Sequence, residues 1–159
     1  MSVTAVIGSR GRMGAMLMER LEAAGRTARG ADLPLTPDVL AAACAGADVA
    51  LLCVPAAVLG DVAHLVAPHL ETGAVLADIA SVKMLPMRAM RKAYAGPVVG
   101  THPLFGPKPS PLNVITIFLF SLNIGWLPLS RSMIESLLPM HRSSIKACRG
   151  LSVPRLQAF

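Results

Sequence analysis

Residues 4–14 read TAVIGSRGRMG, and this stretch decides the fold. The run Thr4–Ile7 is apolar and β-prone, and it ends at Gly8. A helical period follows, because apolar residues recur at spacings of three and four, at Met13, Met16, Leu17 and Leu21. Gly25 then stands where a helix commonly ends. A strand, a glycine-rich turn and a helix in this order predict an α/β fold.

The same alternation continues to about residue 107. Residues 48–54 read DVALLCV, a continuous apolar run that is typical of a strand buried on both faces. We expect further strands at 27–31, 74–79 and 98–99, and helices from Thr36 to about 45 and over 56–70 and 85–95. Thr36 is the expected N-cap of its helix, with Pro37 in the first turn. The pattern predicts a Rossmann-like, doubly wound parallel sheet with helices on both faces.

The chain changes character after about residue 107. Its 159 residues carry a net charge of +6, most of which comes from residues 108–159. That segment is also richer in serine and poorer in alanine than the part before it. We therefore expect a dinucleotide-binding domain over 1–107 and an atypical tail over 108–159, frameshifted or disordered. The basic tail could bind nucleic acid or anionic lipid, but a solvated tail is the simpler interpretation.

Neither a membrane span nor a metal site is expected. The apolar stretch 112–127 is too short for a spanning helix and contains Asn113 and Asn123. The three cysteines, Cys44, Cys53 and Cys148, form no C-x-x-C pair. Free cysteines fit a reducing compartment, and the N-terminus shows no basic leader, so we expect a cytoplasmic protein.

Ligands of open parallel sheets bind beyond the carboxyl ends of the strands, so the residues that follow each strand are the candidates. After the first strand, Gly11 and Gly14 match two glycines of the G-x-G-x-x-G fingerprint, while Ser9 stands where its first glycine belongs. The candidate cofactor-binding loop is Gly8, Ser9, Arg10, Gly11, Arg12, Met13 and Gly14. The alternative is a glycine-rich turn that binds nothing.

Asp32 follows the second strand and bears on the choice of cofactor. A carboxylate there can accept a hydrogen bond from a ribose 2′-hydroxyl and repel a 2′-phosphate, which favours NAD over NADP. Arg10, Arg12 and Arg29 could instead hold a 2′-phosphate, so NADP stays open. Asp32 as an ordinary loop acid is the alternative.

Three more groups follow the later strands. Val54 and Pro55 could pack on the cofactor, or simply end their strand. Ser81 brings a hydroxyl and Lys83 a cation to the same edge. His102 follows the fifth strand, and the proline after it restricts the backbone. We expect His102 to be a general base, although a lone histidine is more often structural.

Four segments in this order resemble the nucleotide-binding domain of prephenate dehydrogenases: AVIGSRGRMG, LLCVP, LADIASVK and GPVVGTHPLFGP. The resemblance covers about residues 3–108. It implies that prephenate and NAD+ yield 4-hydroxyphenylpyruvate, CO2 and NADH, on the route to tyrosine. His102 matches the family's catalytic histidine and Ser81 a serine near the nicotinamide, while Lys83 is the candidate for a substrate carboxylate.

In that family a helical domain follows, which supplies much of the substrate pocket and the dimer interface. The tail of this chain does not resemble it. We therefore expect a truncated prephenate dehydrogenase that is weakly active or inactive, without the family's dimer domain. The alternatives are a non-catalytic NAD-binding fragment, and an arogenate or other Rossmann dehydrogenase.

Overall fold

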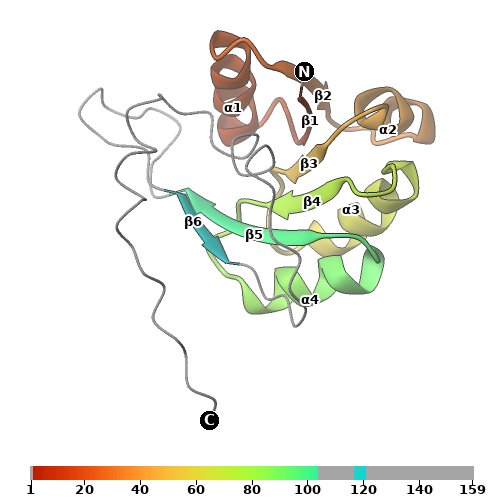
Figure 1. Ribbon diagram of the computed structural model, residues 1–159. Helices are drawn as coiled ribbons and strands as arrows, with labels where there is room; N and C mark the ends of the chain where they lie inside the picture. Colours follow the sequence, from red (N-terminus) through yellow and green to blue (C-terminus); the bar gives the residue numbers. More distant parts are fainter. Residues whose placement is uncertain (1, 104–116, 121–159) are drawn as a thin grey trace.

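A computed structural model describes residues 2–103 and 117–120, which form a six-stranded sheet with helices packed on it (Figure 1). The spatial order of the strands is β2-β1-β3-β4-β5-β6. Their bounds are β1 (Val3–Ile7), β2 (Thr27–Ala31), β3 (Val49–Leu52), β4 (Val75–Asp78), β5 (Val98–Pro103) and β6 (Ile117–Phe120). Strands β1 to β5 pair in parallel, which confirms the predicted Rossmann-like sheet.

Each helix lies between two strands in the chain: α1 (Arg12–Ala23), α2 (Pro37–Cys44), α3 (Leu59–Val66) and α4 (Met84–Ala93). The Thr36 hydroxyl accepts a hydrogen bond from the Val39 N–H and caps α2, as predicted. The helix expected over 56–70 is shorter. It ends at Val66 and continues only as a 3₁₀ turn, Ala67–His69, because Pro68 has no N–H to donate to an α-helical bond.

The core has two layers because side chains alternate across the sheet. Val49 and Leu51 of β3 pack on one face with Met16 and Leu17 of α1. The intervening residues of β3, Ala50 and Leu52, belong to the opposite face, which α2, α3 and α4 cover. The expectation of helices on both faces is therefore confirmed, and α1 stands apart from the other helices in Figure 1.

The sheet extends past the boundary expected at residue 107. Strand β6 pairs antiparallel with β5, in a register that sets Ile117 opposite Pro103 and Phe120 opposite Gly100. This pairing gives backbone partners to the edge of β5 that β4 leaves free. The expected disorder of the remaining tail lies outside the described residues.

The parallel register brings the carboxyl ends of five strands to one edge of the sheet. Residues at matching heights across it are Ala31, Ile7, Leu52, Asp78 and Gly100. The arrowheads of β3, β4 and β5 accordingly point the same way in Figure 1. Most of the predicted site residues lie in the loops that leave this edge, but His102, which was expected after the fifth strand, lies within β5 because that strand extends to Pro103.

Candidate active site at the carboxyl edge of the sheet

The glycine-rich loop is folded tightly against β2. The backbone N–H groups of Gly8 and Ser9 both donate to the Ala31 carbonyl oxygen, at 2.8 and 3.1 Å. Gly11 N–H donates to Gly8 O at 3.1 Å, and Ala15 N–H donates to Gly11 O at 2.8 Å, which begins α1. The loop therefore turns the chain directly from β1 into the helix, with the N-terminus of α1 at the carboxyl edge.

Two of the loop glycines are required by close backbone packing. Gly8 has φ +88°, and a Cβ there would lie 2.5 Å from Cys53 O of the β3 end. A Cβ on Gly14 would overlap Gly8 O. Gly11 differs, because it is exposed and a Cβ there would lie 3.2 Å from Gly8 O, a tight contact without overlap. Gly11 therefore leaves a solvent-facing opening where another group could approach the backbone.

Ser9 is accommodated where the fingerprint has glycine because the positive φ falls on Gly8. The Ser9 hydroxyl donates to Ala31 O at 3.3 Å and lies over β2, where a Cβ on Gly30 would approach its Oγ to 2.7 Å. Both polar hydrogens of Ser9 thus bind Ala31 O within the protein. The hydroxyl secures the loop to β2.

Asp32 joins the end of β2 to the glycine-rich loop. Its Oδ2 accepts from Arg10 N–H at 2.7 Å, and its Oδ1 accepts from Leu33 N–H at 2.8 Å. Each carboxylate oxygen can accept a further hydrogen bond, so Asp32 can still bind a ligand hydroxyl. The side chain of Arg29 points to another partner, because it donates a hydrogen bond to Ala45 O at the end of α2. The side chains of Arg10 and Arg12 are exposed.

Apolar residues flank the loop. Val54 is partly buried beside it, since a Cβ on Gly8 would lie 3.2 Å from Val54 Cγ1. Pro55 is exposed, and Met13 packs on the core layer under α1. The ends of β1, β2 and β3 thus form one continuous group of loops.

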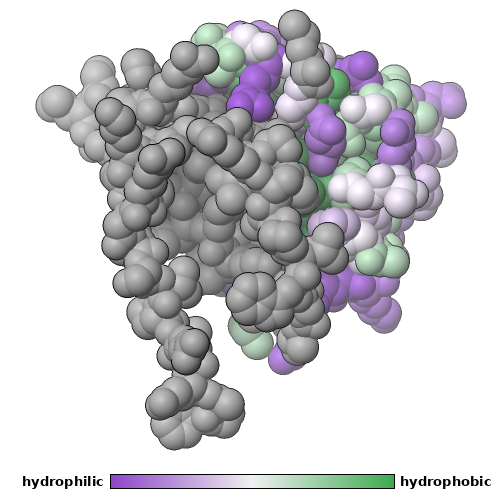
Figure 2. All heavy atoms as spheres, viewed as in Figure 1, coloured by the Kyte–Doolittle hydropathy of each residue, from purple (hydrophilic) through white to green (hydrophobic). Residues whose placement is uncertain are grey.

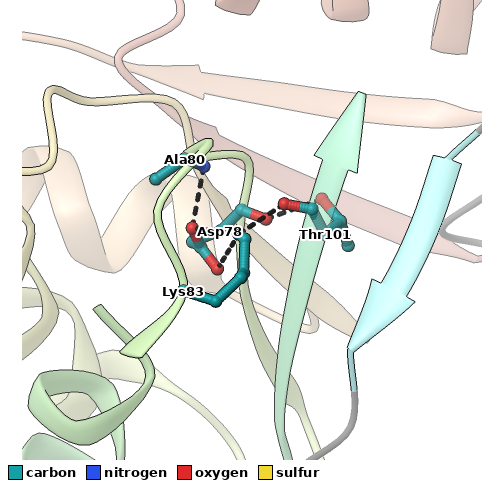
Figure 3. A network of polar contacts seen from close by, with 4 residues as sticks. All are labelled: Asp78, Ala80, Lys83 and Thr101. Atoms are coloured by element: carbon teal, nitrogen blue, oxygen red, sulfur yellow. Dashed lines mark hydrogen bonds and ion pairs between the residues drawn. The ribbon is translucent and has the colours of Figure 1, made fainter. Parts of the chain in front are cut away.

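A second group gathers at the ends of β4 and β5, around the fully buried carboxylate of Asp78 (Figure 3). Lys83 Nζ lies 2.9 and 2.7 Å from the two carboxylate oxygens and also donates to the Thr101 carbonyl. Ala80 N–H donates to Asp78 Oδ2 at 2.7 Å, and the Thr101 hydroxyl donates to the Asp78 carbonyl at 2.6 Å. Burial raises the pKa of the Asp78 carboxyl, while Lys83 and Ala80 act in the opposite direction.

The arrangement gives Lys83 a different environment from the one that the sequence suggested. An ammonium has three N–H donors, and Lys83 directs them at Asp78 and Thr101 O, with only 13% of its side chain exposed. A substrate carboxylate would have to displace one of these partners. These contacts favour a role within the protein for Lys83.

His102 and Ser81 lie at the same edge. His102 is half-buried near the end of β5, and a positive charge on its ring would lower the pKa of Asp78, so the two groups are within electrostatic range. Its Nδ1 is buried and has no hydrogen-bond partner in the described part of the chain. Ser81 is exposed in the bend between β4 and α4.

Sequence reasoning missed Asp78 and Thr101, which organise this second group. A signal was present, because an acid at the end of a fully apolar strand stands five residues before a lysine. A buried acid needs a partner, but only the parallel register of β4 and β5 brings Thr101 beside it.

Neither a metal centre nor a membrane span appears in the part of the chain that the structure describes. Within residues 2–103 and 117–120, no three His, Cys, Asp or Glu side chains gather where they could hold a metal ion. Within the same ranges, no helix is both long and apolar enough to cross a bilayer. On the face shown in Figure 2, hydrophilic residues are interspersed with weakly hydrophobic ones over the described surface.

Residues 18–121 match the family described as prephenate dehydrogenase, nucleotide-binding domain. The chain belongs to this family. The predicted family is therefore confirmed, over a range that contains the last three of the four segments. The match runs from residue 18 rather than 3 and ends at 121 rather than near 108, so it leaves out the glycine-rich loop and includes β6.

Two curated relatives are similar to part of the chain. The chain is 33% identical over 102 residues to the T-protein of Enterobacter agglomerans, covering 64% of this chain and 27% of the relative. It is 40% identical over 73 residues to a probable arogenate/prephenate dehydrogenase of Methanocaldococcus jannaschii, covering 44% of this chain and 16% of the relative. The chain thus spans about a quarter or less of these relatives.

One solved structure in the comparison is prephenate dehydrogenase from A. aeolicus in complex with hydroxyphenyl propionate and NAD+. It superimposes with a TM-score of 0.53 at 18% identity, covering 65% of this chain and 42% of that one. At this identity the likeness concerns the fold.

Proposed function

We propose that this chain is the NAD-binding part of a prephenate dehydrogenase, which oxidises and decarboxylates prephenate. One observation carries the proposal: the parallel register brings the Gly8–Gly14 loop, Asp32 and His102 to one edge of the sheet. A cofactor lying along this edge would reach from the ends of β1 and β2 toward the end of β5. Residues 1–107, together with β6, would form the nucleotide-binding domain.

The described loop fits a dinucleotide. Gly11 leaves the backbone open at the start of α1, where the first-turn N–H groups and the helix dipole favour phosphate oxygens. Asp32, fixed by two backbone N–H groups, is suited to accept a hydrogen bond from the 2′-hydroxyl of NAD. Val54 and Pro55 would supply apolar contact beside the loop.

The chemistry needs a base for the substrate hydroxyl. When bound, NAD+ would supply the hydride acceptor, and prephenate would yield 4-hydroxyphenylpyruvate, CO2 and NADH. His102 would take the hydroxyl proton on Nε2, because its Nδ1 is buried. Ser81, exposed at the same edge, would orient the histidine or the nicotinamide. In this proposal the residues that bind the substrate carboxylates lie outside the described part, since Lys83 is paired with Asp78.

The decisive experiment is calorimetric titration of the 159-residue chain with NAD and with NADP. We expect saturable binding of NAD, weaker binding of NADP, and loss of this preference in Asp32→Asn. The matched control is Asp38→Asn, which changes an exposed acid in the first turn of α2. Failure to bind NAD would overturn the proposal, and an equal or reversed preference would reject the role of Asp32.

A further inference from the structure

The position of the His102 ring depends on the backbone that carries it. No described residue hydrogen-bonds to its Nδ1. The groups that hold the end of β5 therefore decide where the imidazole lies. Strand β6 pairs with β5 from Gly100 to Pro103, and side-chain contacts are made to the two residues before the histidine, Gly100 and Thr101.

Lys83 contacts both of these residues. A Cβ on Gly100 would lie 3.0 Å from Lys83 Cδ, so the stem of the lysine packs against β5 at Gly100. At its end, Nζ donates to the Thr101 carbonyl, which belongs to the peptide bond that leads into His102. Lys83 thus contacts β5 at both residues that precede the histidine.

Asp78 anchors the ammonium at this point. Its buried carboxylate accepts Nζ on both oxygens, and its carbonyl accepts the Thr101 hydroxyl at 2.6 Å. Figure 3 shows Asp78 between Lys83 and Thr101, linking the end of β4 to β5. Charge-assisted hydrogen bonds of this kind are among the stronger ones in proteins.

The geometry points to Lys83 as the positioning residue for His102, with Asp78 as its anchor, rather than as a ligand of the substrate. The catalytic meaning of this inference rests on the proposed role of His102. The positioning itself is a property of the ligand-free chain, so it can be tested without turnover.

The test compares Lys83→Met, Lys83→Arg and the double variant Asp78→Asn/Lys83→Met with the unchanged chain. The double variant removes both charges, so it leaves no unpaired buried ion and should fold where Lys83→Met does not. Lys92→Met is the matched control, because Lys92 is exposed at the end of α4. Ring order parameters and nuclear Overhauser contacts of His102 are measured by NMR, with histidine labelled and no ligand present.

In the double variant, we expect the ring order parameter of His102 to fall from a value typical of a rigid group to one typical of a flexible group. The ring of His64 should not change, since its Nδ1 lies 2.8 Å from Gly60 O, on α3. Lys83→Arg should keep the His102 ring ordered, because a guanidinium can bind the Asp78 carboxylate and the Thr101 carbonyl together. An ordered His102 ring with unchanged contacts in the double variant would overturn the inference.

A parallel titration separates this inference from the proposed function. The double variant should bind NAD within about twofold of the unchanged chain, because its substitutions lie outside the glycine-rich loop. Absence of NAD binding in the unchanged chain would defeat the proposed function, while the NMR result would still decide the inference. A large loss of NAD binding in the double variant alone would contradict a role confined to His102.

Discussion

At the scale of single residues, the buried carboxylate of Asp78 stabilises a positive charge nearby and disfavours a negative one. Lys83 gains a partner from it, whereas Cys53 is disfavoured as a thiolate. Burial, and to a smaller extent the Asp78 carboxylate, raises the pKa of the Cys53 thiol to about 12. Cys53 should therefore be an unreactive thiol, although it is adjacent to the proposed cofactor loop.

This prediction can be measured by alkylation. Against an ordinary value of 9.0, a pKa of about 12 lowers the thiolate fraction at about pH 8 roughly a thousandfold. We expect iodoacetamide to label Cys53 correspondingly more slowly in the native chain than in concentrated guanidinium, as followed by peptide mass spectrometry. Equal labelling rates in the two conditions would show that the Cys53 thiol is not buried and that its pKa is not raised.

At the scale of elements, the β1–α1 turn separates a glycine needed for folding from one available for binding. Gly14→Ala sets a Cβ against Gly8 O, a backbone atom that cannot rotate away. We expect it to lower the free energy of unfolding by about 1–3 kcal/mol or more, as overpacking does. Denaturant unfolding followed by circular dichroism measures the change.

Gly11→Ala is the matched variant of the same turn. Its Cβ would lie 3.2 Å from Gly8 O, so we expect a loss of less than about 1 kcal/mol. If phosphates approach the backbone at Gly11, the affinity of the Gly11→Ala chain for NAD should nevertheless fall at least about tenfold, equivalent to about 1.4 kcal/mol. Unchanged affinity in a folded Gly11→Ala chain would contradict this assignment of the phosphate site.

At the scale of the whole molecule, the described sheet brings the proposed base and the proposed cofactor loop to one edge, but its one lysine at the His102 end of that edge is already paired. Transition-state stabilisation in such a reaction needs cations for the substrate carboxylates and a site closed to water. The chain spans only 27% of the T-protein of Enterobacter agglomerans, which it resembles over 102 residues.

We therefore expect the 159-residue chain to produce NADH from prephenate far more slowly than the prephenate dehydrogenase from A. aeolicus, or not at all. Absorbance of NADH under identical conditions measures both rates. In a complete enzyme that contains this domain, His102→Asn should lower kcat by roughly two to four powers of ten and leave NAD binding nearly unchanged. Comparable rates from the two proteins would mean that residues 104–159 help to build a working substrate site.

The sequence alone determined the order and type of the elements. Hydrophobic periodicity, the Thr36 cap and the glycine after α1 are local features, and each acts within one or two turns of chain. Because these features are local, the approximate ends of the strands could be predicted before the fold was known. The same prediction gave the candidates near those ends, Asp32, Ser81 and His102. Two features were missed: the early end of the third helix, because the effect of Pro68 was overlooked, and strand β6.

Only the tertiary structure decided how these candidates are partnered. The contact of Asp32 with the Arg10 backbone joins residues 22 apart, and that of Lys83 with Thr101 joins residues 18 apart. The sequence around each residue does not predict either contact, because both contacts arise from the register in which parallel strands pair. The antiparallel pairing of β6 with β5 likewise joins residues far apart in the chain, whereas Lys83 and Asp78 are only five residues apart. A charged side chain in a sequence shows what it can bind, but the packing of distant strands determines which partner it meets.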